Sequence, residues 1–408
     1  MFILFVFLVL ENVFEKYIPQ MSYFDEIITI ALLIMTILKI CNSRVHQKRY
    51  IKIYMCLGAV LLIGFLSTFI YQVQDNMIAV LKDALAVSKF FVVYVYAAEY
   101  IKIKNPKKVL KNIELFSKGY IFILFVFGLI NQIADIGMDS GYRGVIKTYL
   151  FMYTHATFMV ASIVIVCTML IAGGWKKNMS YLTMATVILV MSMRAKAFIY
   201  IASVVLFCII IRSYMSGKIR NIWTRKIRRR VSIAGVFIAV AVYFISREKI
   251  SAYMMWGLAA ARPALYIVGF QILQDFFPLG SGFATFASTL SGKYYSPLYL
   301  KYGIQNTSGL MRSEGYPYIA DTYWPYVFAQ FGLFGAVFYM LGLVGIFKDV
   351  LQHCKINMNC LIASFALFIY LIASCFVETM LTNAPVVLSA FTLGYYIRIQ
   401  CEVSRGIK

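Results

Sequence analysis

Two arginines stand where they could bind an anion. Arg194 interrupts a long apolar stretch, and Arg262 immediately precedes Pro263, a residue that suits the first turn of a helix. The guanidinium of Arg262 is therefore expected beside free backbone N–H groups and the positive end of a helix dipole. Lys196 is a weaker candidate for the same role. Snorkelling to lipid headgroups or an ordinary salt bridge is the alternative for all three cations.

Carboxylates and a histidine could complete such a site. Asp321 lies just before an apolar stretch that opens at Trp324, so it either caps a helix or accepts a proton from a hydroxyl group. With an ordinary pKa of about 3.9, it is ionised at neutral pH. Tyr323 is a candidate substrate-binding residue beside it. Glu378 and His155 are further candidates, and ordinary interfacial or core positions are the alternative for both.

A region rich in glycine and tyrosine follows residue 278. Gly280 and Gly282 flank Ser281 in a turn that either lets backbone amides approach a phosphate or simply ends the preceding helix. The tyrosines of this region either stack on sugar rings or form an aromatic belt at the membrane interface. They are Tyr294, Tyr295, Tyr299, Tyr302, Tyr316 and Tyr318.

The composition indicates that membrane helices position these residues. Hydrophobic residues make up 62% of the 408-residue chain and charged residues 14%, with a mean hydropathy of +0.78, which excludes an ordinary soluble domain. The net charge of +22 does not indicate nucleic-acid binding, because Lys and Arg gather in short clusters between apolar segments. Clusters of this kind stay on the cytoplasmic side of a membrane.

Residues 1–408 are expected to form one all-α, polytopic membrane domain of about twelve helices, each near the ~20 residues that cross a bilayer. With both termini cytoplasmic, every basic cluster falls on the inner side. The first span is expected to be a retained helix rather than a signal peptide. The expected spans are 2–18, 25–41, 53–73, 78–100, 115–136, 150–172, 180–193, 197–212, 232–247, 324–347, 361–380 and 386–400.

One large external loop, residues 246–323, interrupts this pattern, and loops of this length are usually functional. Within it, residues 263–277 are apolar but too short to cross, so we expect a helix lying in the membrane interface.

The stretch 180–211 is too long for one upright helix, which predicts a helical hairpin with Arg194 and Lys196 at its outer tip. The scattered histidines and the cysteines, which fall in expected helices or inner loops, predict neither a metal site nor a disulfide framework.

In order and topology these residues resemble the bacterial polysaccharide repeat-unit polymerases of the Wzy type, which are related to the O-antigen ligases. The resemblance covers roughly residues 140–345 and rests on short motifs. They are Thr154-His155-Ala156-Thr157 at the start of a span, Met193-Arg194-Ala195-Lys196 at a hairpin tip, Arg262 followed by Pro278-Leu279-Gly280-Ser281-Gly282, and Asp321-Thr322 followed after nine residues by Gly332-Leu333-Phe334-Gly335. Asp321 stands where the ligase motif has a histidine, which favours a polymerase.

The resemblance implies an inverting glycosyl transfer at the outer face of the bacterial inner membrane. The donor would be an undecaprenyl-diphosphate-linked glycan, and a hydroxyl of a second lipid-linked repeat unit would attack its anomeric carbon. Arg194 and Arg262 would stabilise the departing diphosphate, and Asp321 would orient or deprotonate the hydroxyl. No metal, nucleotide sugar or other cofactor would be needed. The product would be an O-antigen, capsule or exopolysaccharide, and a flippase and a chain-length regulator are candidate partners.

Two alternatives stay open. A ligase would move a finished glycan onto a different acceptor. A lipid-linked oligosaccharide flippase, or another transporter, would perform no catalysis and would place charges near the membrane midplane. Lys82, Asp83 and Lys89 lie within an expected span and keep the transporter open.

Overall fold

The computed structural model describes residues 1–42, 48–102, 105–134, 136–143, 145–213, 251, 255–354, 357–404 and 406. The chain is mostly helical, with one two-stranded sheet among the described residues. The expected span 232–247 lies outside the described residues.

The first part of the chain contains eight helices named α1 to α8, one short 3-10 helix and the two strands. Their bounds are α1 Phe2–Tyr17, η1 Pro19–Tyr23, α2 Phe24–Asn42, α3 Lys48–Tyr71, α4 Met77–Glu99, α5 Pro106–Ile133, β1 Asp139–Arg143, β2 Ile146–Tyr149, α6 Ala156–Ala172, α7 Met179–Met191 and α8 Ala195–Ser213.

The second part carries the helices of the predicted external loop, which is called the outer loop below, and the C-terminal helices. Their bounds are η3 Gly257–Ala259, α10 Ala261–Asp275, α11 Thr289–Lys293, α12 Pro297–Lys301, η4 Arg312–Glu314, α13 Trp324–Cys354, α14 Met358–Ser374, α15 Pro385–Phe391, the π-helical turn η5 Thr392–Tyr396 and α16 Ile397–Ser404.

Four helical segments of the described residues are long and apolar enough to cross a membrane. They are Pro19–Lys39, Tyr50–Tyr71, Pro106–Ile133 and Trp324–Cys354. Other expected spans contain shorter helices, such as α7 with 13 residues, below the ~20 residues of an upright crossing. The number of crossings therefore stays a prediction. The helical hairpin is confirmed, because α7 ends at Met191 and α8 begins at Ala195, with Arg194 between them.

The expectation of an all-α fold needs one correction. Residues 139–149 form an antiparallel hairpin of β1 and β2, and α6 begins at Ala156 rather than at residue 150. The start of α6 is set by a cap, because Nδ1 of His155 accepts a hydrogen bond from the amide of Thr157 at 3.2 Å. Apolar side chains near residue 150 continue the hydropathy of the span, so hydropathy alone places the helix start too early.

α10 packs against α13, and this contact places the starts of both helices at one end of the fold. Its buried residues recur every three or four positions: Ala261, Ala264, Leu265, Val268, Gly269 and Ile272. Phe270 stacks on Phe328 of α13, with ring centroids 4.5 Å apart. The helix predicted at 263–277 is thus present, shifted by two residues to Ala261–Asp275.

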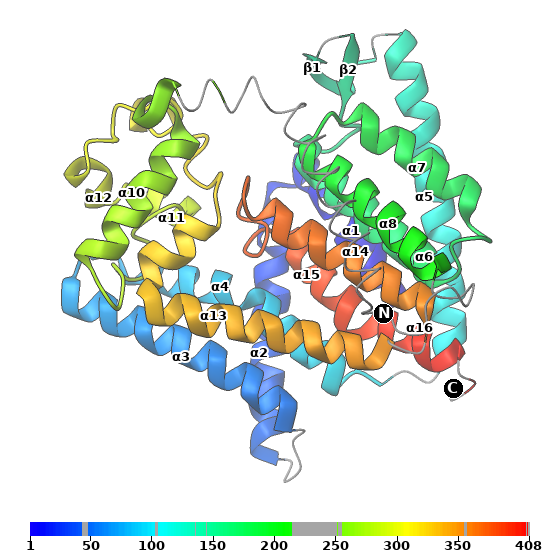
Figure 1. Ribbon diagram of the computed structural model, residues 1–408, viewed down its shortest axis with the longest axis horizontal. Coiled ribbons are helices and arrows are strands. Elements are labelled where there is room, and N and C mark those ends of the chain that lie inside the picture. The colour runs from blue at the N-terminus through cyan, green and yellow to red at the C-terminus, as the bar shows by residue number, and fades with distance from the viewer. Residues whose placement is uncertain are drawn as a thin grey trace.

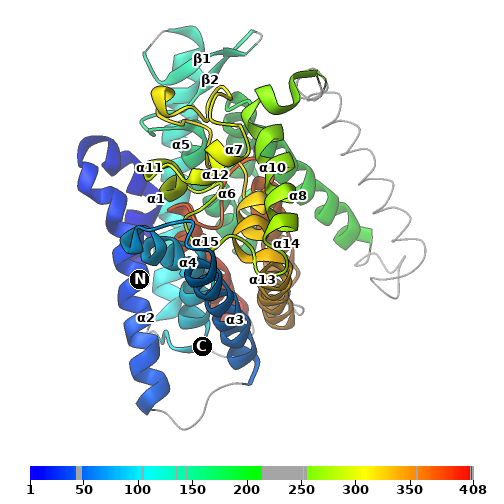
Figure 2. The ribbon, with the colours of Figure 1, turned by 90° about the vertical axis from the view of Figure 1, so that its left-hand side faces the viewer.

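Figure 1 shows two groups of helices that share a central layer. α10, α11 and α12 lie over one end of α3, α4 and α13, while α5 to α8 and α14 to α16 form the other side. In Figure 2 the outer-loop helices and the β1–β2 hairpin both lie toward the same end, and both termini lie away from it. This arrangement brings the helices of residues 257–314 and the β1–β2 hairpin to the same end of the fold (Figure 2).

Candidate functional site

Arg262, near the start of α10, forms an ion pair with Asp321, which lies just before α13. Nη2 of Arg262 is 2.9 Å from Oδ2 of Asp321. The same nitrogen is 3.5 Å from the carbonyl oxygen of Val377, in the segment after α14. The two side chains remain 32% and 27% exposed, so a ligand can reach them. Three segments that are distant in the sequence therefore converge on one accessible ion pair.

The tip of the α7–α8 hairpin brings four more candidates together. Nη2 of Arg194 is 3.4 Å from Nε2 of His155. Nζ of Lys196 is 2.6 Å from Oε1 of Glu378 in a buried ion pair. Glu378 directly follows Val377, whose carbonyl oxygen is the one beside Arg262, and the charges of Glu378, Arg262 and Asp321 all act on the pKa of Arg194. The predicted residues at the hairpin tip and at the outer loop therefore belong to one electrostatic site.

Arg143, at the end of β1, is a member of this site that the sequence pattern did not single out. Its Nη1 donates to the carbonyl oxygen of Met193 at 3.0 Å, and its charge acts on Arg194 and His155. A signal was available, because Arg143 lies in an outer loop of the expected topology, as Arg194 does. We call these seven residues the charge cluster: Arg143, His155, Arg194, Lys196, Arg262, Asp321 and Glu378.

The charge cluster has more cations than carboxylates. Lys196 pairs with Glu378, and Arg262 pairs with Asp321. Within the described part of the chain, neither Arg143 nor Arg194 forms a salt bridge with a carboxylate, and Nε of Arg194 is buried without a hydrogen-bond partner. Buried or half-buried positive charge without a counterion is unfavourable. Arg194 is half-buried whereas Arg143 is exposed, so it is chiefly the unpaired charge of Arg194 that favours an anionic ligand.

Burial and the neighbouring cations set the protonation of the cluster. Burial raises the pKa of the Asp321 carboxyl above its ordinary value, and Arg262 opposes this rise. Burial, with Arg194 as the next cause, lowers the pKa of His155 to about 4, so the imidazole is neutral at neutral pH. Burial also lowers the pKa of Arg194, with Arg143 adding to the effect. A guanidinium keeps its proton despite such a shift.

The neutral imidazole of His155 is a further reason to expect an anion. Its Nδ1 accepts from the amide of Thr157, which assigns the ring proton to Nε2. Nε2 and Nη2 of Arg194, 3.4 Å apart, are then two donors that face each other. A phosphate oxygen placed beside both would accept from each of them.

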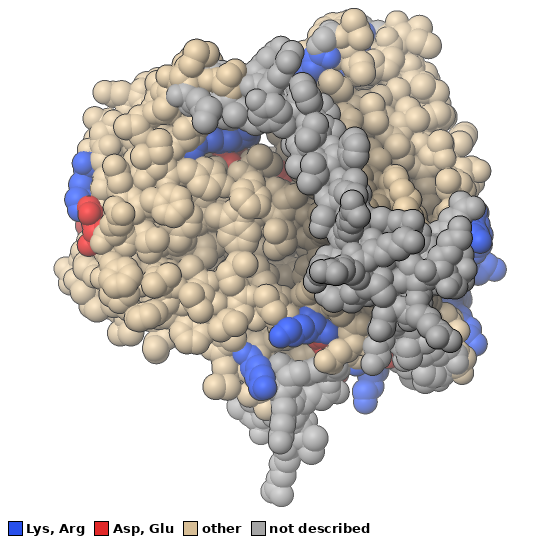
Figure 3. All heavy atoms as spheres, viewed as in Figure 1, with Lys and Arg blue, Asp and Glu red and all other residues tan. Residues whose placement is uncertain are grey.

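The charge cluster and the lysine-rich ends lie on opposite faces of the helical domain. His155 precedes α6, whereas Lys177 follows it; Asp321 precedes α13, whereas Lys348 lies near its far end. Figure 3 shows basic and acidic atoms meeting at a hollow near the top of one face, with other charged atoms mainly near the edges. This separation matches the expected topology, in which basic loops and the site lie on different sides.

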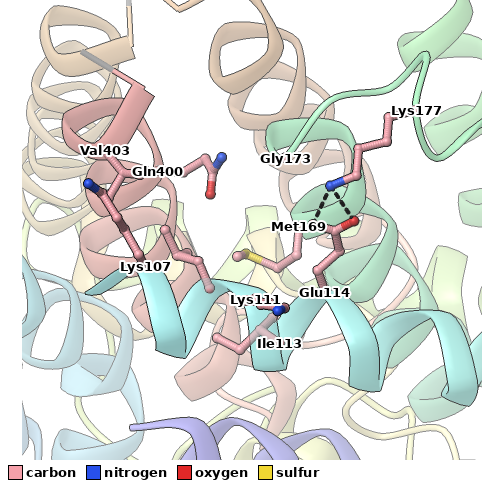
Figure 4. A pocket seen from close by; sticks show the side chains of 10 residues that line it. Lys107, Lys111, Ile113, Glu114, Met169, Gly173, Lys177, Gln400 and Val403 are labelled. Carbon is pink, nitrogen blue, oxygen red and sulfur yellow. Dashed lines mark hydrogen bonds and ion pairs between the residues drawn. The ribbon is translucent and has the colours of Figure 1, made fainter. Parts of the chain in front are cut away.

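A pocket of about 340 Å³, separate from the charge cluster, lies at the lysine-rich end between α5, α6 and α16. Figure 4 shows Lys177 reaching toward Glu114, and its Nζ lies 2.7 Å and 2.9 Å from the two carboxylate oxygens. Lys107 and Lys111 also line it. These lysines are exposed, so the pocket offers solvated charges rather than the half-buried guanidinium groups of the charge cluster.

Gly280 and Gly282 serve packing rather than phosphate contact. The amide of Gly280 donates to the carbonyl of Phe276 at 2.8 Å, and the amide of Gly282 donates to the carbonyl of Gln330 at 2.9 Å. A Cβ on Gly280 would lie 2.3 Å from the amide nitrogen of Gly332. The prediction that these amides approach a ligand is therefore corrected: the amide of Gly280 closes the turn after α10, and the amide of Gly282 holds the outer loop against α13.

Tyr323 also has a structural position. Its side chain is fully buried, and its hydroxyl donates to the hydroxyl of Tyr339 at 2.6 Å. Its backbone amide donates to the carbonyl of Cys375 at 3.0 Å. Tyr323 therefore ties the segment that carries Asp321 to the segment that carries Glu378, instead of reaching a ligand.

Charges within the expected fourth span have partners inside the fold. Oδ2 of Asp83 accepts from the amide of Ala284 at 2.7 Å, and Nζ of Lys89 lies 2.5 Å from Oδ2 of Asp25. Gln330 donates to the carbonyl of Phe286 at 2.6 Å. Asp83 and Gln330 thus fix the buried segment 279–287 of the outer loop between α4 and α13.

The tyrosines of the outer loop range from fully buried to exposed, with Tyr295 and Tyr316 half-buried. Tyr299 is fully buried and donates or accepts within the loop's own core, and Tyr302 donates to Asp275 at 2.6 Å. Tyr294 and Tyr318 are 36% and 51% exposed. The rings of Tyr294 and Tyr318 are therefore the ones that a ligand could reach.

No group of His, Cys, Asp and Glu in the described part of the chain could hold a metal ion. Comparison with known proteins finds no family model that matches this chain and no curated protein that is significantly similar to it.

Proposed function

We propose that this chain is a membrane glycosyltransferase that polymerises undecaprenyl-diphosphate-linked oligosaccharide repeat units, as its resemblance to the Wzy-type polymerases implies. The observation that carries the proposal is the convergence of Arg194 and Arg262 beside Asp321 in one accessible charge cluster. A diphosphate diester carries one negative charge on each phosphorus, which matches the two cations that lack a carboxylate partner within the described residues, Arg143 and Arg194.

The reaction is an inverting displacement. A hydroxyl oxygen of the acceptor unit attacks the anomeric carbon of the donor, the bond from that carbon to the diphosphate oxygen breaks, and undecaprenyl diphosphate leaves with the electron pair. Arg194 and Arg262 stabilise the charge that grows on the leaving group, an effect worth about 10²–10³ in rate for a single contact. The hydroxyl proton passes to Asp321.

The ion pair of Arg262 and Asp321 sets the order of the steps: the donor binds before the base is activated. A bound diphosphate competes with Asp321 for the guanidinium of Arg262, because both are oxygen anions. Donor binding therefore releases the carboxylate toward the acceptor hydroxyl. Asp321 is then activated as a base by the arrival of the donor.

The proposal places the charge cluster at the outer face of a bacterial inner membrane, with about twelve crossings and both termini inside. The separation of the cluster from the lysine-rich helix ends supports this orientation. Asp321 in place of the ligase histidine favours a polymerase over a ligase. The internal partners of Asp83 and Lys89 favour an enzyme over a transporter, because these charges have structural roles.

Deletion of the gene in its source strain tests the proposal. We expect single repeat units linked to lipid, or displayed singly at the surface, in place of a polymer ladder. Lipid-linked units confined to the inner leaflet would instead support a flippase. A full-length polymer that is not attached to its final acceptor would support a ligase.

A further inference from the structure

An apolar groove opens beside the charge cluster, between α8, α13 and α14. Its cavity volume is about 770 Å³. Lys196 and Val377 line one end, and Phe207 of α8 lines the other, where its ring stacks on that of Phe365 with centroids 4.7 Å apart. The distance along α8 from Lys196 to Phe207 is about 16 Å at 1.5 Å per residue.

The polar end of the groove is shared with the charge cluster. Lys196 holds Glu378 at 2.6 Å, and the carbonyl oxygen of Val377 lies 3.5 Å from Nη2 of Arg262. Every other lining residue is apolar. A molecule that occupies both regions must therefore carry an anionic head directly joined to a long apolar chain.

We propose that this groove binds the head-proximal part of the polyprenyl tail of the donor while the charge cluster binds its diphosphate. The inference rests on the proposed function and adds a tail site to the diphosphate site. One groove accommodates one chain, which suits a polyprenol with its single tail better than a phospholipid with two. Aromatic side chains such as Phe347 and Phe368 line it and provide broad contact surfaces for a branched hydrocarbon.

The groove contributes a modest part of the binding free energy and also fixes the direction of the donor. Bilayer lipid is as apolar as the groove, so moving a tail from lipid into the groove gains mainly packing contacts. A tail held along α8 fixes the direction from which the diphosphate enters the charge cluster. The anomeric carbon is then presented toward Asp321 in a restricted set of orientations.

Two positions on α13 provide a matched pair of variants. Val344 is 41% exposed and lines the groove, whereas Leu341 is 53% exposed and does not. Val344→Trp places an indole in the path of the tail, and Leu341→Trp places the same group one turn away. Both substitutions are apolar and partly exposed, so each is compatible with folding.

The experiment measures binding of undecaprenyl diphosphate and of isopentenyl diphosphate to the purified full chain in lipid nanodiscs. The two probes share the head and differ in tail length. We expect Val344→Trp to weaken binding of undecaprenyl diphosphate about tenfold and to leave isopentenyl diphosphate unchanged, with no effect of Leu341→Trp on either. Arg262→Ala should weaken both probes.

The outcomes separate the tail site from the head site. Unchanged binding of undecaprenyl diphosphate to the Val344→Trp variant, with Arg262→Ala weakening both probes, overturns the tail site and leaves the proposed function standing. Failure of both probes to bind the unaltered chain overturns the diphosphate site, and the tail site with it.

A photoreactive amino acid at position 344 identifies the occupant. Labelling of undecaprenyl diphosphate supports the inference. Labelling of phospholipid alone, or of the chain's own residues 232–247, overturns it.

Discussion

Nη2 of Arg262 lies 2.9 Å from Oδ2 of Asp321. The residue proposed to bind the diphosphate and the residue proposed as the base are therefore paired with each other before a substrate binds. The pair bridges the start of α10 and the start of α13, and Phe270 stacked on Phe328 holds these two helices together. Changes to either residue should therefore affect both binding and proton transfer.

Arg262→Ala should shorten or abolish the polymer in cells. Loss of one contact to the leaving diphosphate costs about 10²–10³ in rate, and Arg262→Lys should restore only part of it, because lysine lacks the planar fork of donors. The measurement is the length distribution of the surface polysaccharide. Arg312→Ala is the control, since Arg312 lies exposed in the same outer loop. A normal ladder from Arg262→Ala would remove this residue from the diphosphate site.

Asp321 should make kcat/KM fall on the acid side of its pH profile, the acidic limb, at a higher pH than an ordinary aspartate would. The base works as a carboxylate, and burial raises its pKa, so activity is lost as the pH falls through that raised value. Arg262 favours the ionised form, so Arg262→Ala should move the limb of the residual activity to still higher pH. The pH dependence of kcat/KM measures this shift. A limb that persists unchanged in Asp321→Asn would assign the proton transfer to another group.

The ion pair between Lys196 and Glu378 should stabilise the fold as well as the site. Their side chains are only 4% and 10% exposed, so Glu378→Gln leaves a buried ammonium unpaired and should cost about 3–5 kcal/mol of unfolding free energy. Lys196→Met combined with Glu378→Gln should recover most of that loss. Thermal unfolding of the purified variants provides the comparison. Equal losses in the single and double variants would show that the unpaired ammonium is not the cause of the loss.

Gly332 should tolerate no side chain. Its backbone has φ 62° and ψ −165° inside α13, and a Cβ there would lie 2.1 Å from the carbonyl oxygen of Pro278. Gly332→Ala should therefore cost about 3 kcal/mol or more, through strain and displacement of the outer loop. Gly303→Ala is the control, because Gly303 also has a positive φ, of 69°, but has open space around its Cβ position. Similar thermal stabilities of the two variants would contradict the close packing of the loop.

The helix positions and several site residues could be predicted from the sequence. Hydropathy located α10 and the α7–α8 hairpin, because long apolar runs and the interruption at Arg194 are local signals. The rarity of charge in an apolar chain pointed to Arg194, Arg262 and Asp321. The structure places these residues in one charge cluster, while their catalytic roles stay predictions.

Other features depend on contacts that no local pattern contains. Gly280 and Gly282 have the composition of a phosphate-binding turn, but close packing on α13 and α3 fills the space beside them, and the amide of Gly282 donates to Gln330 of α13. Tyr323 lies in the core, where its hydroxyl bonds to that of Tyr339, a residue 16 positions later in the sequence. Arg143 was overlooked because its short β-hairpin lies between two strong helix signals, and only the fold brings it to Met193.

The most direct test of the account is chain growth by the purified full-length protein in detergent, supplied with a synthetic lipid-linked repeat unit as both donor and acceptor. We predict that the unaltered protein and the Arg312→Ala variant extend the glycan, and that Arg194→Ala reduces the rate by about 10²–10³ while the variant remains folded. Undiminished chain growth by Arg194→Ala would contradict the claim that the charge cluster binds the diphosphate.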